Sequence, residues 1–176
     1  MPITALVFAG GLSRRMGEDK ARMFGGVERL RRLLGESGVN RTVVLCGSPS
    51  RRSLFEGEVL ADPEGLKGLH QLIVWARTAV GGTVLLVPCD AFLLTKDGVQ
   101  FMLEHEDAGG VPTDELERRQ PLFALIPEAF SLDAQATSVE DLLANLPTLE
   151  TGALGREFTN FNTPSEVARH QLEPHR

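Results

Sequence analysis

The segment that most constrains the fold is an apolar run followed by a loop dense in glycine and basic residues. Residues 3–8 read Ile-Thr-Ala-Leu-Val-Phe, which is typical of a buried strand, and residues 9–20 read Ala-Gly-Gly-Leu-Ser-Arg-Arg-Met-Gly-Glu-Asp-Lys. Glycines let main-chain N–H groups approach a phosphate without a Cβ in the way, and basic side chains stabilise the anion. The spacing is that of neither a Walker A loop nor the G-x-G-x-x-G fingerprint. We therefore predict a phosphate-binding loop of another type.

The rest of the chain alternates between apolar runs and segments of helical period. The run over residues 83–88 is uniformly apolar, as expected of a central parallel strand that is covered on both faces. This alternation predicts an α/β fold, a three-layer α/β/α sandwich with a Rossmann-like, mostly parallel sheet. We expect further strands over residues 41–46, 58–63, 109–112 and 121–126, and helices over residues 27–35, 66–80, 95–106, 138–146 and 164–172.

Composition limits the classes of partner. The 176 residues are most simply one domain, 1–176, and the net charge of -6 argues against a nucleic-acid partner while leaving a small nucleotide open. No run reaches the roughly 18 apolar residues of a membrane span, and the start of the chain lacks the pattern of a signal peptide. We therefore expect a cytoplasmic protein. Cys46 and Cys89 read as buried thiols near strand ends, with no metal-ligand spacing.

Two aspartates stand at the ends of predicted strands, Asp62 within the last residues of one and Asp90 after another. Ligands of open α/β sheets bind outside the carboxyl ends of strands, so Asp62 and Asp90 are placed to contact one. Asp90 would hold Mg²⁺ against nucleotide phosphates, although a helix N-cap or a turn also accounts for it. Asp62 reads equally as a ligand contact and as a turn-forming Asp-Pro pair. The charges of residues 113–119 read as a solvated loop rather than as catalytic groups, although Arg118 and Arg119 lie directly before Gln120-Pro121.

The chain ends with two amides spaced by one residue. Asn160 and Asn162 would project to the same side of an extended segment, and amides offer both donors and acceptors, as a pterin or a phosphate requires.

Four motifs together resemble one family. The loop at residues 9–20, with Val87-Pro88-Cys89-Asp90, Gln120-Pro121-Leu122-Phe123-Ala124-Leu125 and Asn160-Phe161-Asn162-Thr163-Pro164-Ser165-Glu166, is similar to the nucleotidyltransferases related to molybdenum cofactor guanylyltransferase. The motifs stand in the family's order and cover nearly the whole chain.

This resemblance implies a nucleotide-diphospho-sugar transferase type of fold and an Mg²⁺-dependent reaction. GMP would pass from GTP to the terminal phosphate of molybdopterin (molybdenum cofactor), with release of diphosphate. It also implies transient contact with other cofactor-biosynthesis proteins. The site residues implied by the matching motifs are Phe8, Ala9, Gly10, Gly11, Ser13, Arg14, Lys20, Asp62 and Asp90 for the nucleotide, Lys20, Asp90 and Arg15 for catalysis, Asp90 for the metal, and Gln120, Asn160 and Asn162 for the acceptor.

Three stretches depart from the family pattern. Leu45-Cys46-Gly47 replaces an asparagine after the second strand, residues 65–69 lack the usual proline, and the segment after Lys20 is short. Two alternatives therefore stay open. One is a nucleotidyltransferase of the same fold with another acceptor or base, such as a sugar phosphate or cytidylyl transfer to the pterin. The other is a non-catalytic nucleotide-binding module.

Overall fold

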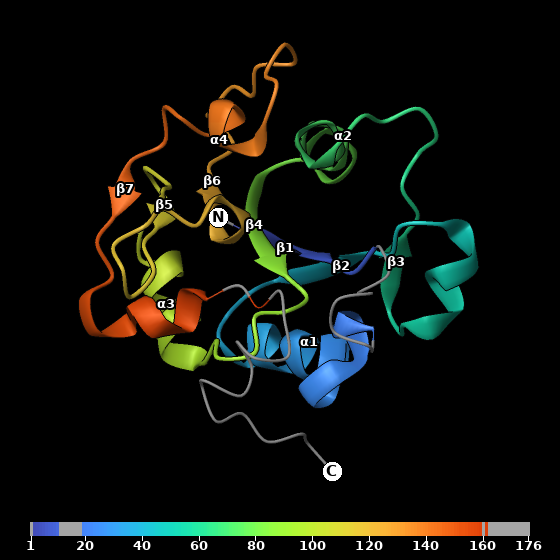
Figure 1. Ribbon diagram of the computed structural model, residues 1–176, viewed down its shortest axis with the longest axis horizontal. Helices are drawn as coiled ribbons and strands as arrows, with labels where there is room; N and C mark the ends of the chain where they lie inside the picture. Colours follow the sequence, from blue (N-terminus) through green and yellow to red (C-terminus); the bar gives the residue numbers. More distant parts are fainter. Residues whose placement is uncertain (1, 11–18, 160, 162–176) are drawn as a thin grey trace.

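A five-stranded sheet forms the centre of the molecule (Figure 1). The computed structural model describes residues 2–10, 19–159 and 161. The strand order is β3-β2-β1-β4-β6, in which the first four strands are parallel and β6 runs antiparallel to β4. The strands are β1 (Ile3–Phe8), β2 (Arg41–Leu45), β3 (Glu58–Leu60), β4 (Thr83–Pro88) and β6 (Leu125–Ile126).

The two central strands are covered on both faces. Every residue of β1 and β4 is buried, and the strands pair in register from Ile3 opposite Thr83 to Phe8 opposite Pro88. Successive side chains of a strand point to opposite faces. The two strands therefore supply both halves of the core, which confirms the prediction made from their uniformly apolar sequences.

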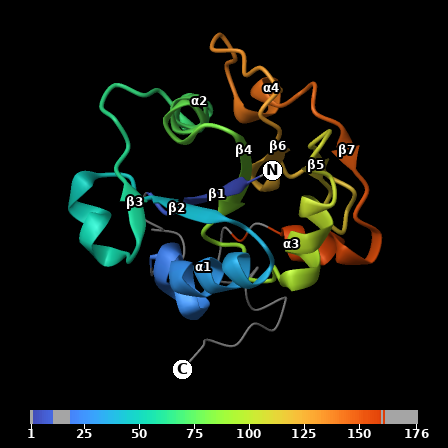
Figure 2. The same cartoon turned by 180° about the vertical axis from the view of Figure 1, so that it is seen from behind.

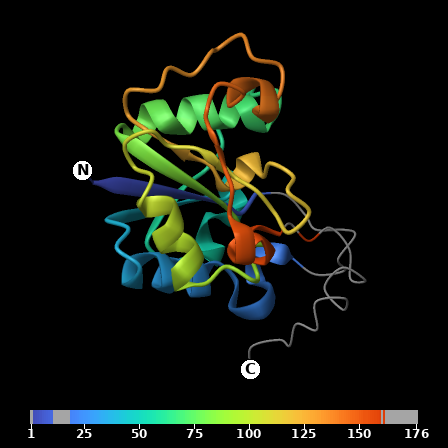
Figure 3. The same cartoon turned by 90° about the vertical axis from the view of Figure 1, so that its left-hand side faces the viewer.

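Helices cover both faces of the sheet, so the three-layer fold is confirmed (Figures 2 and 3). On one face lie α1 (Gly26–Glu36) and α3 (Lys96–Leu103), which pack with Ala5 and Val7 of β1. On the other lie α2 (Leu69–Val80) and α4 (Val139–Leu142), which pack with Leu6 and Phe8. Within the described ranges no helix is long and apolar enough to cross a membrane.

The remaining elements are short. A second, two-stranded parallel sheet joins β5 (Val111–Pro112) and β7 (Thr148–Leu149). The 3-10 helices are η2 (Lys20–Gly25), η3 (Pro49–Leu54), η4 (Pro121–Phe123) and η5 (Gly152–Phe158).

Sequence and structure differ most at residues 121–126. The expected six-residue strand begins as the 3-10 helix η4, and only Leu125 and Ile126 form β6. Pro121 has no N–H to donate to a neighbouring strand, so the turn replaces the first half of the ladder. The helix expected over residues 138–146 is confined to α4, where the Ser138 side chain accepts a hydrogen bond from the N–H of Asp141 as an N-cap. The helix expected over residues 164–172 lies outside the described residues.

Candidate functional site

The carboxyl ends of the four parallel strands form one continuous edge. The hydrogen-bond ladder continues past the strands, because Ala9 N–H donates to Leu45 O at 2.8 Å and Cys46 N–H donates to Leu60 O at 2.9 Å. At the same edge Cys89 N–H donates to Phe8 O at 3.2 Å. The segments that follow β1, β2, β3 and β4 are thereby held side by side, where open α/β sheets bind ligands.

Gly10 is required by the close approach of two of these segments. A Cβ built on Gly10 would lie 2.8 Å from the Cα and 3.0 Å from the N of Gly47, distances that a real side chain does not tolerate. The first glycine of the predicted phosphate loop therefore lets the segment after β1 pass over the segment after β2. The other predicted loop residues, Gly11, Ser13, Arg14 and Arg15, lie outside the described residues, whereas Phe8 and Ala9 are buried at the end of β1.

Lys20 and Asp90 meet at this edge, although 70 residues separate them in the sequence. Lys20 Nζ lies 3.0 Å from Asp90 Oδ2, and the two side chains are only 16% and 10% exposed. The same Asp90 oxygen accepts a hydrogen bond from the main-chain N–H of Phe161 at 3.3 Å. Two residues that the motifs pointed to thus form one largely buried ion pair.

Burial raises the pKa of Asp90, while the charge and hydrogen bond of Lys20 and the Phe161 N–H lower it. The net direction is upward, and Lys20 is the largest of the influences that oppose the rise. Among the described residues no group of three or more His, Cys, Asp or Glu side chains could hold a metal ion. Mg²⁺ in nucleotide sites needs only one or two carboxylates in addition to phosphate oxygens and water, so a single aspartate at the strand end fits that ion.

Arg51 is a site residue that sequence reasoning missed. Its Nη1 lies 2.8 Å from Asp19 Oδ2, its Nη2 donates to Ala9 O at 2.7 Å, and its Nε donates to Cys46 O at 3.0 Å. Asp19 is the N-cap of η2, the helix that begins with Lys20. Arg51 therefore ties the ends of β1 and β2 to the residue next to Lys20. No signal in the local sequence, which reads as one turn of helix, pointed to this role.

Asp62 follows β3 and faces the loop after β2. Its N–H donates to Gly47 O at 2.8 Å, which fixes the main chain. Among the described residues Asp62 Oδ1 is buried without a hydrogen-bond partner. Burial raises the pKa of this carboxyl group, and a backbone hydrogen bond with Gly47 offsets part of the rise. A buried acceptor without a donor is costly, so this oxygen is a place where a ligand N–H or O–H would be stabilised.

Both cysteines are free thiols; Cys46 is buried as expected, whereas Cys89 is only partly buried. Burial, with the Asp90 charge second, raises the pKa of Cys89 to about 12. Burial also raises the pKa of Cys46, whose Sγ lies 3.5 Å from Ser48 O. Neither thiol is a nucleophile at neutral pH, because the thiolate is the reactive form.

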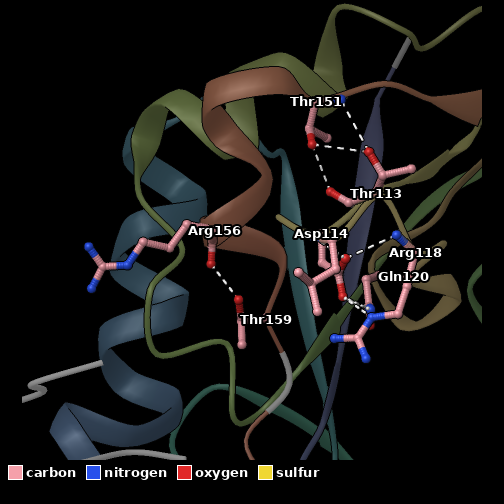
Figure 4. Close-up of polar contacts among 8 residues, drawn as sticks. Thr113, Asp114, Arg118, Gln120, Thr151, Arg156 and Thr159 are labelled. Atoms are coloured by element: carbon pink, nitrogen blue, oxygen red, sulfur yellow. Dashed lines mark hydrogen bonds and ion pairs between the residues drawn. The ribbon is translucent and has the colours of Figure 1, made fainter. Parts of the chain in front are cut away.

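On the other side of β4, Gln120 is held by Asp114 (Figure 4). Gln120 Nε2 donates to Asp114 Oδ2 at 2.8 Å, and its main-chain N–H donates to Pro112 O. The charges of residues 113–119 were expected to be solvated, which is wrong for Asp114, because that residue is only 5% exposed. The predicted acceptor residues Asn160 and Asn162 lie outside the described residues.

Comparison with known proteins identifies the family. Residues 5–149 match the MobA-like NTP transferase domain. The molybdenum cofactor guanylyltransferase of Xanthomonas euvesicatoria pv. vesicatoria is 32% identical over 96% of this chain and 94% of its own length. That of Shewanella sp. (strain ANA-3) is 31% identical over 98% and 97%.

Solved structures show the same fold at lower identity. The molybdopterin-guanine dinucleotide biosynthesis protein A of Archaeoglobus fulgidus has a TM-score of 0.68 at 19% identity, over 94% of this chain and 95% of that one. The 4-diphosphocytidyl-2C-methyl-D-erythritol synthase of Anaerococcus prevotii has a TM-score of 0.61 at 8% identity, over 97% and 99%.

Proposed function

Since the chain belongs to the family of MobA-like NTP transferase domains and is a nucleotidyltransferase, we propose that it transfers GMP from GTP to the terminal phosphate of molybdopterin. The relatives that are about 30% identical over nearly their full length carry the name molybdenum cofactor guanylyltransferase. Within this chain, the observation that supports the proposal most directly is the buried pair of Lys20 and Asp90 beside the loop that follows β1.

The proposed reaction is one displacement at phosphorus. A phosphate oxygen of molybdopterin forms a bond to the α-phosphorus of GTP while the bond from that phosphorus to the bridging oxygen of the diphosphate breaks. The products are the guanine dinucleotide of the pterin and diphosphate, which carries away the negative charge. Such a transfer asks the protein mainly for positioning and charge stabilisation, and it needs no covalent nucleophile.

The proposed roles follow the chemistry of each side chain. Lys20 supplies a cation to the triphosphate, and Arg14 or Arg15 would neutralise the leaving diphosphate. Asp90 would hold Mg²⁺, which when bound supplies further charge neutralisation to phosphate oxygens. Asp62 offers its buried oxygen to an N–H or O–H of the nucleotide. The acceptor would approach from the side of Gln120.

The first experiment is calorimetric titration of the purified protein with GTP, CTP, ATP and UTP, each with and without Mg²⁺. Selective, metal-dependent binding of GTP is expected and would lead to a transfer assay with molybdopterin. A preference for CTP would move the base assignment to cytidylyl transfer. Absence of binding for all four nucleotides would contradict the proposal.

Two substitutions test the assigned roles in that assay. Asp90→Asn should lower the rate of transfer by about 100-fold or more, because it removes a charge that acts in the transition state. Lys20→Ala should weaken GTP binding. Lys96→Ala is the matched control, since Lys96 is an exposed lysine at the start of α3. Wild-type transfer by Asp90→Asn would contradict its role.

A further inference from the structure

A single buried carboxylate organises the turn between β5 and η4. Asp114 Oδ1 accepts hydrogen bonds from the main-chain N–H groups of Leu116 at 2.9 Å and Arg118 at 3.0 Å. Asp114 Oδ2 accepts from Arg118 Nε at 2.9 Å and from Gln120 Nε2 at 2.8 Å. Four donors therefore converge on one side chain (Figure 4). Gly155 of η5 packs against this turn, where a Cβ would lie 2.9 Å from the Asp114 carbonyl carbon.

The two neighbouring arginines of this turn have opposite surroundings. Arg119 points inward: its Nη1 donates to Leu146 O and Thr148 Oγ1, and its Nη2 donates to Leu143 O. Arg118 points outward, with a side chain that is 68% exposed although its Nε is bound to Asp114. The described residues offer no partner to Nη1 and Nη2 of Arg118. Arg119 serves the fold, whereas Arg118 presents an oriented guanidinium to solvent.

The turn lies on the side of the molecule to which the parallel strands point (Figure 3). β6 pairs with β4, and Gly110, the residue before β5, forms an isolated bridge with Leu125 of β6, so the start of β5 lies next to the β6 edge of the central sheet. Adjacent strands are about 4.8 Å apart, so Gly110 lies about 10 Å from β4 at the level of Leu125. Asp114 follows β5 by two residues and Asp90 follows β4 by two residues. An elongated molecule could therefore contact both.

We infer that Arg118, positioned by Asp114, binds the end of the acceptor substrate opposite to its reacting phosphate. This inference rests on the proposed function, in which the reacting phosphate lies at Asp90. The group that Arg118 binds is an anion or a hydrogen-bond acceptor such as a ring carbonyl, because a guanidinium offers only donors. Holding Nε on a buried carboxylate removes side-chain freedom before binding, so less entropy is lost when the substrate binds.

The test compares a long acceptor with a short one. Arg118→Ala should raise the KM for molybdopterin by between about 10- and 100-fold, the loss expected for charge-assisted hydrogen bonds. The Kd for GTP, measured by calorimetry, should stay unchanged. Inhibition by glycerol phosphate, which carries a phosphate but lacks the distal part of the acceptor, should also stay unchanged. Arg118→Lys should recover part of the loss, because lysine keeps the charge but not the planar pair of donors.

Arg32→Ala is the matched control, since Arg32 is an exposed arginine on α1. Asp114→Asn should raise the same KM without changing the Kd for GTP, as a positioning residue would. If wild-type protein transfers GMP to molybdopterin and Arg118→Ala has the wild-type KM, the inference is wrong and the proposed function stands. If wild-type protein makes no transfer, the proposed function fails, and the inference fails with it.

Discussion

Arg51→Ala should weaken the whole nucleotide side of the site without removing a residue that contacts the substrate. The substitution deletes two charge-assisted hydrogen bonds to main-chain oxygens, Ala9 O and Cys46 O, and the ion pair with Asp19. Each such hydrogen bond contributes about 1.5–3 kcal/mol, and the lower end of this range applies because Arg51 is only partly buried. The ion pair, whose Asp19 side chain is 21% exposed, adds under about 1 kcal/mol. The expected loss of unfolding free energy is about 2–4 kcal/mol.

In a chain of this length, that loss corresponds to a fall in Tm of roughly 6–12 °C, which differential scanning calorimetry would measure. The Kd for GTP should rise as well, because Asp19 caps the helix that begins with Lys20. Arg52→Ala is the matched control, since Arg52 is exposed and carries the same charge one residue away. A Tm of Arg51→Ala equal to that of Arg52→Ala would refute the claim that Arg51 ties these segments together.

Three further predictions concern the packing and charges of the site. Gly10→Ala should destabilise the protein by about 1–3 kcal/mol in urea unfolding, because its Cβ would meet main-chain atoms at 2.8 Å, whereas Gly35→Ala, with nothing within 4 Å, should stabilise α1 slightly. For Asp114, burial raises the pKa but hydrogen bonds from Arg118 and Leu116 bring it below the ordinary value. The stability that Asp114 adds over Asp114→Asn should therefore be full above about pH 4 and lost as pH falls through the lowered pKa, as stepwise urea titrations would show. Lys20→Ala and Asp90→Asn should be non-additive by about 1 kcal/mol or more in a double-mutant cycle, because the first leaves a buried carboxylate unpaired and the second removes that penalty.

Much of the fold was predictable because hydrophobic burial dominates it. β1 and β4 begin and end where their apolar runs do, since every residue of both strands is buried. Residues 121–126 read as one strand for the same reason, yet Pro121 removes a donor and only two residues pair with β4. Where an apolar run includes a turn, the hydrophobic pattern alone does not reveal at which residue strand pairing begins.

The candidate site likewise contains residues whose position the sequence predicts and residues whose position it does not predict. The position of Asp90 and Lys20 at one edge of the sheet was predictable. Ligands of open α/β sheets bind outside the carboxyl ends of the strands, and the motifs place a carboxylate and a basic loop there. Arg51 and Asp114 were not predictable, since their partners are main-chain atoms that only the folded chain brings together. The local sequence shows only that Arg51 and Asp114 are charged. Charged residues are mostly exposed to solvent, so the sequence does not predict a buried role for them.

Arg51 and Asp114 carry opposite charges, but both hold main-chain groups in place and orient a neighbouring residue. Arginine has only donors, and Arg51 lies where carbonyl oxygens converge, at Ala9 O and Cys46 O. An ionised aspartate has only acceptors, and Asp114 lies where the N–H groups of a turn converge. Each then orients one neighbour toward the edge of the sheet, Lys20 through Asp19 in the first case and Arg118 in the second. Because the two anchors share no partner and lie on opposite sides of the central strands, the effects of Arg51→Ala and Arg118→Ala on catalytic efficiency should add, which would show that the nucleotide and acceptor sides are positioned independently.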